Sequence, residues 1–223
     1  MKWKMSDPSE KKYIFPYWGP YIMETHIDRE LVDLLLEKGV ETKLDARKDL
    51  AAQINKEFYY ENYEDWFISK FSPYIDLYSE GLIKYLPSAF KFLYGTDTWF
   101  FPSGDMEERS WTLDKLWINY QQPGEYNPPH HHTGDLSFVT YLQVPRELIT
   151  EHEEKKEEHN NEGPGAICFQ YGEQLPFSIS RYWRLPDEGM FIIFPAWVQH
   201  YAHSFTSDVE RISVSGNIRF KGS

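Results

Sequence analysis

Three consecutive histidines, His130, His131 and His132, lie in the middle of the chain. Neutral imidazole is a common protein ligand for iron and zinc. On an extended chain, side chains two positions apart point the same way, so His130 and His132 are placed to share one metal ion while His131 points elsewhere. The preceding Pro128 and Pro129 stiffen the backbone. A histidine-rich surface turn that binds no metal is the alternative.

A second candidate metal ligand, His200, comes much later in the sequence. It follows the apolar segment 190–194 and the short stretch 195–199, where a buried strand is expected to end. A histidine at the end of a core strand often has only a structural role. His200 therefore joins the candidate ligands only in combination with the residues around it.

Polar and apolar side chains alternate in the segment 211–218, which is typical of a strand. If the polar face lines a pocket, the Arg211 guanidinium offers a fork for a carboxylate, with the Ser213 hydroxyl beside it. If that face meets water instead, the alternation needs no ligand. The segment 117–121 has a similar polar pair, Asn119 and Gln121.

The elements expected to position these residues differ between the two halves of the chain. Residues 1–110 are predicted to be a mostly helical support region, with helices over about 28–39, 46–59 and 63–85 and with Pro73 interrupting or kinking the third. Residues 111–223 are predicted to form the β-rich core, with strands over 113–121, 136–144, 166–171, 190–194 and 211–220. The two parts are expected to form one compact domain. The charged segment 150–161 is predicted to be an exposed insertion of unknown role.

Composition narrows the function classes. The chain has 223 residues, 17% of them aromatic, and a formal net charge of −12, so it can bury a sizeable core and shows no basic footprint for nucleic acid or an anionic membrane. No signal peptide or membrane-spanning run is visible, and a cytoplasmic protein is expected. The single cysteine, Cys168, lies in an apolar run and is expected to be buried and structural.

Together these features resemble the iron(II)/2-oxoglutarate-dependent oxygenases. The sequence is most similar to the uncharacterised prolyl-hydroxylase-like branch of that superfamily, found in bacteria and bacteriophages. The resemblance spans roughly residues 111–220. The matching segments are 117–119, 123–132, 137–142, 164–165, 186–190, 194–195, His200 and 211–217. It implies a double-stranded β-helix, also called a jelly roll or cupin-like fold, that carries the site, with the helices at the N-terminal end.

The resemblance also implies cofactors and roles. Fe(II) would be held by His130, the distal His200 and a third ligand, and no other catalytic residue is expected. Arg211, which lies eleven residues after His200 and begins an Arg-x-Ser motif, would bind 2-oxoglutarate together with Ser213, Asn119 and Tyr141. With O2 as the oxidant, such an enzyme converts 2-oxoglutarate to succinate and hydroxylates a second molecule. Trp197, Tyr141 and Tyr171 are candidate pocket walls.

One position departs from the superfamily pattern, which places a carboxylate where this chain has His132. Either three imidazoles hold the metal, which we favour, or Asp135 supplies the carboxylate after a turn at Gly134. A three-histidine cupin-type metalloenzyme that does not use 2-oxoglutarate is a second hypothesis. A non-catalytic binding β-barrel is a third. A small-molecule or protein side-chain substrate is expected. The sequence leaves the substrate's identity, turnover and the oligomeric state open.

Overall fold

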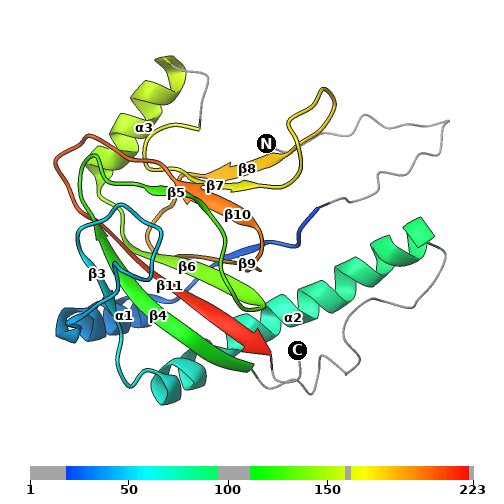
Figure 1. Ribbon diagram of the computed structural model, residues 1–223, viewed down its shortest axis with the longest axis horizontal. Coiled ribbons are helices and arrows are strands. Elements are labelled where there is room, and N and C mark those ends of the chain that lie inside the picture. Colours follow the sequence, from blue (N-terminus) through cyan, green and yellow to red (C-terminus); the bar gives the residue numbers. More distant parts are fainter. Residues whose placement is uncertain (1–18, 95–110, 159–161, 221–223) are drawn as a thin grey trace.

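The computed structural model describes residues 19–94, 111–158 and 162–220, which form two β-sheets and three helices (Figure 1). The seven-stranded sheet has the order β1-β9-β6-β11-β4-β3-β2, and the four-stranded sheet has the order β5-β10-β7-β8. All paired strands are antiparallel. The predicted double-stranded β-helix is confirmed.

The larger sheet combines strands from both halves of the sequence. Its strands are β1 (Met23–His26), β2 (Leu44–Asp45), β3 (Glu57–Tyr59), β4 (Trp111–Gln121), β6 (Leu136–Gln143), β9 (Met190–Pro195) and β11 (Arg211–Phe220). The smaller sheet contains β5 (Asn127–His130), β7 (Ile167–Gln170), β8 (Arg181–Arg184) and β10 (Gln199–Ala202). Three strands of the larger sheet therefore come from the region expected to be mostly helical. The proposed division at residue 110 stays a prediction.

Two helices cover the outer face of the larger sheet. These are α1 (Arg29–Glu41) and α2 (Glu64–Tyr94) (Figure 1). Phe67 and Phe71 of α2 are fully buried, and the Phe67 ring stacks on the ring of Phe138 from β6. The other face of β6 and β9 packs toward the smaller sheet through Val139, Tyr141 and further apolar side chains. Burial on both faces explains why the segment 190–194 is apolar without alternation.

Several expected elements are confirmed, with shifts of a few residues at their ends. The helix predicted over 28–39 is α1, with the buried Val32 and Leu35 on its inner face. The five predicted strands correspond to β4, β6, β7, β9 and β11. The third predicted helix is α2, which extends to Tyr94 and runs through Pro73 without an interruption.

The helix predicted over 46–59 is wrong. Leu50, Ile54 and Phe58 have helical spacing, yet residues 57–59 form β3, which pairs with β4. Pairing with an exposed strand edge outweighed a weak helical pattern, since tertiary context commonly overrides local propensity. Ile54 packs instead against the pocket between the sheets.

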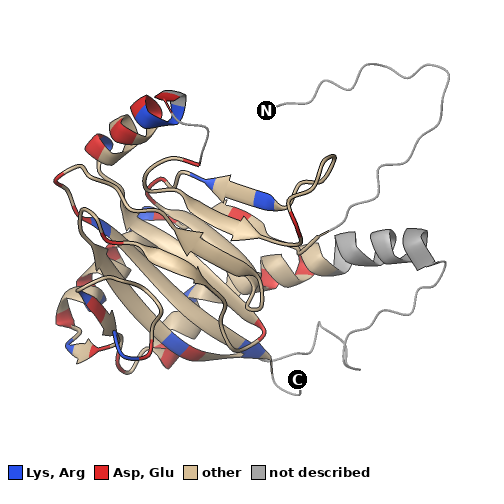
Figure 2. Cartoon of the chain, turned by 45° about the horizontal axis from the view of Figure 1, so that its top comes forward, with Lys and Arg blue, Asp and Glu red and all other residues tan. Residues whose placement is uncertain are grey.

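The expectation of an exposed insertion over 150–161 needs correction. Most of it belongs to helix α3 (Arg146–Glu158), and the side chains of Glu151 and His152 are buried. Charged side chains of both signs lie along α3, whereas the central strands carry few charges (Figure 2). Among the described residues, no helix has the length and apolar character needed to cross a bilayer.

Candidate metal centre and co-substrate pocket

Strand register brings His130 and His200 together. His200 of β10 is the Cα partner of His130 of β5, so the two side chains lie opposite each other on one face of the smaller sheet. His132 follows β5, and its backbone N–H donates to the Ala196 carbonyl at 2.9 Å, which fixes it beside the turn that leads into β10. The expected convergence of the three imidazoles is therefore present in the structure.

The three rings form a compact triangle. Their centroids are 4.8 Å apart for His130 and His132, 4.2 Å for His130 and His200, and 4.9 Å for His132 and His200. One nitrogen from each ring lies within 4.8 Å of the other two. Phe194 and Trp117 contact the triangle from the larger sheet. This spacing suits a divalent metal ion at the centre.

Backbone carbonyls set the tautomers of two of the rings. Nδ1 of His130 is 2.7 Å from the Pro128 carbonyl oxygen, and Nδ1 of His200 is 3.0 Å from that of Val198. Because a carbonyl oxygen only accepts, each Nδ1 carries the proton and each Nε2 keeps a free lone pair. A second partner of this kind is typical of metal-binding histidines.

The surroundings keep all three imidazoles neutral. Burial, followed by the neighbouring His130 and His131, lowers the pKa of His132 to about 3. Burial also lowers the pKa of His130, and it lowers the pKa of His200 well below its ordinary value. The neutral ring is the form that binds a metal, so the site is preorganised for a cation and disfavours protons.

The predicted co-substrate residues form two adjacent rows on the inner face of the larger sheet. Gln121 pairs with Arg211 in one row, and Asn119, Ser213 and Tyr141 are Cα partners in the next. All five line the same pocket as the three histidines. Segments far apart in the sequence therefore supply one polar surface facing the metal site.

Arg211 is buried without an acidic partner. Its guanidinium donates to the Gly165 carbonyl at 2.5 Å and to Oε1 of Gln121. Its Cζ atom lies 5.4 Å from the centroid of the Tyr141 ring. Nε has no hydrogen-bond partner, and none of the ion pairs found among the described residues involves Arg211. Burial lowers its pKa. A buried cation without a counter-charge is costly, so this arrangement fits an anionic ligand.

Asp135, the alternative third ligand, is turned to another partner. Its carboxylate accepts a hydrogen bond from the Phe220 backbone N–H at 2.7 Å, and its backbone joins Ala196 to Ile218. It is absent from the metal-binding group that contains His132. The turn at Gly134 therefore places Asp135 between Ala196 and Ile218. As the third metal ligand, His132 fits this geometry better than Asp135 does.

Two of the three candidate pocket walls lie elsewhere. Tyr141 is fully buried and lines the pocket. Trp197 and Tyr171 are exposed and pack against each other with ring centroids 5.7 Å apart. Their position in turns at the ends of strands leaves them outside the space between the sheets.

The sequence interpretation missed several residues at the site. Asn127 lines the pocket from β5, a strand whose two prolines gave it no strand signal, and its Oδ1 has no hydrogen-bond partner. Glu57 was assigned to a helix, yet it pairs with Asn119 across β3 and β4. The three aromatic residues that follow Glu57, at positions 58–60, are the local signal of a strand there.

Comparison with known proteins bears on the family and the fold. Residues 115–217 match the family described as putative 2OG-Fe(II) oxygenase. A prolyl-4-hydroxylase from Pseudomonas putida superposes with a TM-score of 0.51 at 12% identity, covering 90% of this chain and 93% of the other. The chain has the fold of the 2-oxoglutarate–iron(II) oxygenases. Its resemblance to that superfamily is confirmed.

Two further similar structures have lower TM-scores. The viral collagen prolyl hydroxylase of Paramecium Bursaria Chlorella virus-1 is 14% identical, with 90% of this chain and 96% of the other covered and a TM-score of 0.48. A non-haem alpha-ketoglutarate-dependent epimerase of nogalamycin biosynthesis is 14% identical, with 89% and 78% covered and a TM-score of 0.44. No match was found among the curated proteins.

Proposed function

We propose that this protein is an Fe(II)- and 2-oxoglutarate-dependent dioxygenase that hydroxylates an organic substrate. The observation that carries the proposal is a pocket in which three neutral imidazoles face a buried guanidinium that has no acidic partner among the described residues. The imidazoles suit a divalent metal. The guanidinium suits the distal carboxylate of a diacid.

In this proposal His130, His132 and His200 hold the iron through one nitrogen each. Bound iron would supply the activation of O2 that couples the oxidation of 2-oxoglutarate to succinate and carbon dioxide with oxidation of the substrate. Because all three ligands are neutral, the metal keeps its full positive charge, which strengthens its attraction for an anionic co-substrate.

The polar rows on the larger sheet orient 2-oxoglutarate. Arg211 would pair with the distal carboxylate, and the Ser213 hydroxyl would donate to the same group. Asn119 and Tyr141 would hold the middle of the molecule between that carboxylate and the metal. Phe194 and Val139, which also line the pocket, exclude water from this space.

A three-histidine cupin-type enzyme that ignores 2-oxoglutarate is less well supported. An enzyme of that type would have no 2-oxoglutarate carboxylate to pair with Arg211, so the free-energy cost of burying the Arg211 charge would have no explanation. A non-catalytic barrel leaves the convergence of three histidines unexplained. The prolyl hydroxylase from Pseudomonas putida suggests peptidyl proline as the first substrate to test, with small metabolites next.

The decisive experiment measures oxygen-dependent succinate formation from 2-oxoglutarate with added Fe(II). Wild-type protein and the exposed-residue control His131→Ala should both form succinate, whereas His200→Ala should not. Anaerobic addition of Fe(II) and then 2-oxoglutarate should give a visible charge-transfer band that Arg211→Met weakens. Background succinate in the wild type together with no visible band would refute the proposal.

A separate comparison tests the third ligand. Asp135→Asn should retain iron binding, and His132→Ala should lose it, if three imidazoles hold the metal. The reverse pattern would assign the third position to Asp135.

A further inference from the structure

The outer face of the smaller sheet carries a second group of metal-ligand side chains. Along β7 and β10, Phe169 and His200 point toward the larger sheet, whereas their neighbours Cys168 and Tyr201 are Cα partners on the opposite face. Glu162 precedes β7, and His203 follows β10. The backbone N–H of His203 donates to the Ala166 carbonyl at 2.9 Å, which fixes His203 beside β7.

Three different ligand types meet at this face. A carboxylate oxygen of Glu162, the sulfur of Cys168 and a ring nitrogen of His203 all lie within 4.8 Å of one another. Cys168 is fully buried, and Glu162 is 7% exposed. The iron-site histidines point to the other side of the same sheet, so this group is separate from the pocket.

The contacts inside the group are incomplete. Nε2 of His203 is buried and has no hydrogen-bond partner in the part of the chain that the structure describes. It lies 3.6 Å from Oε2 of Glu162, which is longer than a hydrogen bond between these atoms. The other carboxylate oxygen, Oε1, pairs with the Arg181 guanidinium at 2.6 Å. Arg181 thus orients the carboxylate and leaves Oε2 directed at the imidazole, as outer partners of metal ligands commonly do.

We propose that Glu162, Cys168 and His203 bind a zinc ion. Zinc accepts thiolate, imidazole and carboxylate ligands in tetrahedral sites, and three protein ligands leave the fourth position for water. Magnesium and calcium are less suited to this set, because they prefer oxygen ligands and a thiolate is a soft ligand. The inference does not depend on the proposed oxygenase activity.

A merely structural cysteine explains less. Cys168 is buried, as expected from the sequence, yet its neighbours include a carboxylate and an imidazole instead of apolar side chains alone. Burial and then the charge of Glu162 raise the pKa of the thiol to about 12. A bound dication would instead stabilise the thiolate, because the dication displaces the thiol proton and offsets the negative charge of Glu162.

The site would join the segment before β7 to the end of β10. Since β10 carries His200, a metal on the outer face would hold the strand that supplies an iron-site ligand. The two sites would lie on opposite faces of one small sheet. Zinc should therefore raise the melting temperature of the protein even when the inner site has been removed.

Cobalt(II) titration of the full chain tests the proposal, because a thiolate bound to Co²⁺ gives an intense near-ultraviolet charge-transfer band. Cys168 is the only cysteine, so such a band can come from no other residue. We expect the band in the wild type and also in His200→Ala, where the inner site is removed. We expect Cys168→Ser to abolish it, and added Zn²⁺ to displace the cobalt and bleach it.

Two further variants separate a three-ligand site from a lone thiol. Glu162→Gln and His203→Gln should each weaken Co²⁺ binding by at least about tenfold, judged by the effects of altering metal sites. His131→Ala serves as the exposed-histidine control and should leave the band unchanged. Circular dichroism without metal shows whether each variant is folded. The proposal is overturned if the folded wild type shows no sulfur-dependent band, or if both glutamine variants titrate as the wild type does.

Discussion

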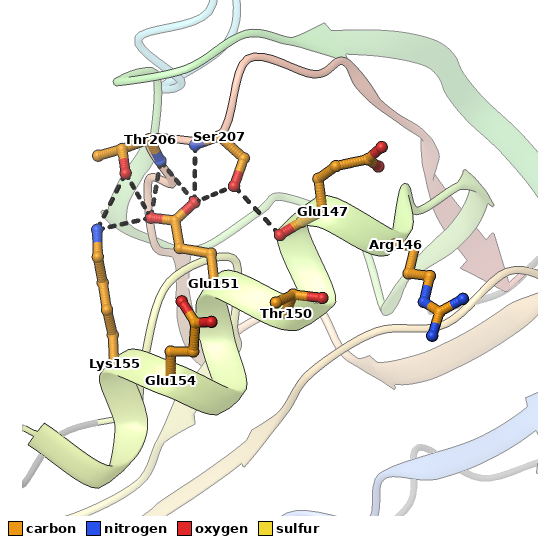
Figure 3. A pocket seen from close by; sticks show the side chains of 8 residues that line it. All are labelled: Arg146, Glu147, Thr150, Glu151, Glu154, Lys155, Thr206 and Ser207. Carbon is orange, nitrogen blue, oxygen red and sulfur yellow. Dashed lines mark hydrogen bonds and ion pairs between the residues drawn. The ribbon is translucent and has the colours of Figure 1, made fainter.

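Two regions of this protein bury charged side chains in opposite ways. At the contact between α3 and the loop after β10, Glu151 accepts hydrogen bonds from the backbone and hydroxyl groups of both Thr206 and Ser207, and it pairs with Lys155 at 2.8 Å (Figure 3). In the pocket, Arg211 has two neutral acceptors and an unpartnered Nε. The Glu151 carboxylate has its hydrogen-bond partners within the protein and therefore holds two segments together. The Arg211 guanidinium keeps an unused donor and is therefore suited to bind a ligand.

Glu57 is a further buried carboxyl group, and it resembles the pocket more than the α3 contact. It is 1% exposed, and within residues 19–94, 111–158 and 162–220 neither carboxylate oxygen has a hydrogen-bond partner. Its Cα partner is Asn119, whose Oδ1 also lacks a hydrogen-bond partner among these residues. The unsatisfied groups thus extend from Arg211 across the larger sheet to β3.

The largest effect is expected at the metal site. His200→Ala should reduce 2-oxoglutarate turnover by more than about 100-fold, since even altering the outer partners of a metal ligand costs about 10- to 100-fold. Succinate formation under saturating Fe(II) measures this loss. The exposed His131→Ala, from the same histidine triplet, should retain wild-type turnover. Equal activity in both variants would contradict the assignment.

Arg211→Met should raise the 2-oxoglutarate concentration needed for half-maximal succinate formation by about 10- to 100-fold, which is the loss of one charged hydrogen-bonding interaction. In the wild type, 2-oxoglutarate should also raise the melting temperature, and in this variant that shift should shrink. Arg219→Met is the matched control on the same strand, because Arg219 is exposed and pairs with Asp114 at 2.9 Å. If the half-maximal 2-oxoglutarate concentration rose equally in Arg211→Met and Arg219→Met, the assignment of Arg211 as the co-substrate-binding residue would be wrong.

Glu57→Gln should change stability in a pH-dependent way. Burial, followed by the charges of Glu125 and Asp45, raises the pKa of Glu57 to about 8 from its ordinary 4.5. Folded protein therefore keeps a proton that the unfolded chain releases, so wild-type stability falls as pH rises from 4.5 to 8. The variant should exceed the wild type by several kcal/mol at about pH 9, with little difference near pH 5.

Urea unfolding across this pH range measures the effect of Glu57→Gln. Glu61→Gln, an exposed carboxylate nearby, should show no comparable trend. A stability difference that does not vary with pH would mean that Glu57 is already paired in solution.

The smallest effect is expected at the α3 contact. Glu151→Gln should lower the free energy of unfolding by about 1.5 kcal/mol near pH 7, because it removes charge from several hydrogen bonds. Although burial acts to raise it, hydrogen bonds from Lys155, Ser207 and Thr206 lower the pKa of Glu151 to about 2. The stabilisation is thus complete above pH 4.5 and is lost as pH falls toward 2.

Chemical denaturation compares Glu151→Gln with Glu154→Gln, whose exposed carboxylate lies one turn away beside the same depression (Figure 3). Only Glu151→Gln should have a lower free energy of unfolding. The 2-oxoglutarate concentration for half-maximal activity of Glu151→Gln should match that of the wild type. If Glu151→Gln bound 2-oxoglutarate more weakly but kept its stability, the structural role assigned to the α3 contact would be wrong.

The sequence by itself determined the elements whose pattern is local. The alternation in 211–218 predicted β11, and the apolar run 190–194 predicted the doubly covered β9. The two-residue spacing of His130 and His132 predicted that they share a face. Arg211 and Ser213 followed from the same periodicity, because a strand fixes the direction of alternate side chains whatever surrounds it.

Only the tertiary structure decided which distant residues meet. The register of β10 against β5 places His200 opposite His130, and the pairing of β3 with β4 turned an expected helix into the strand that carries Glu57. The partners of Asp135 and Glu151 likewise come from strands and loops far along the chain. Such contacts depend on strand pairing and burial between remote segments, which local spacing does not specify.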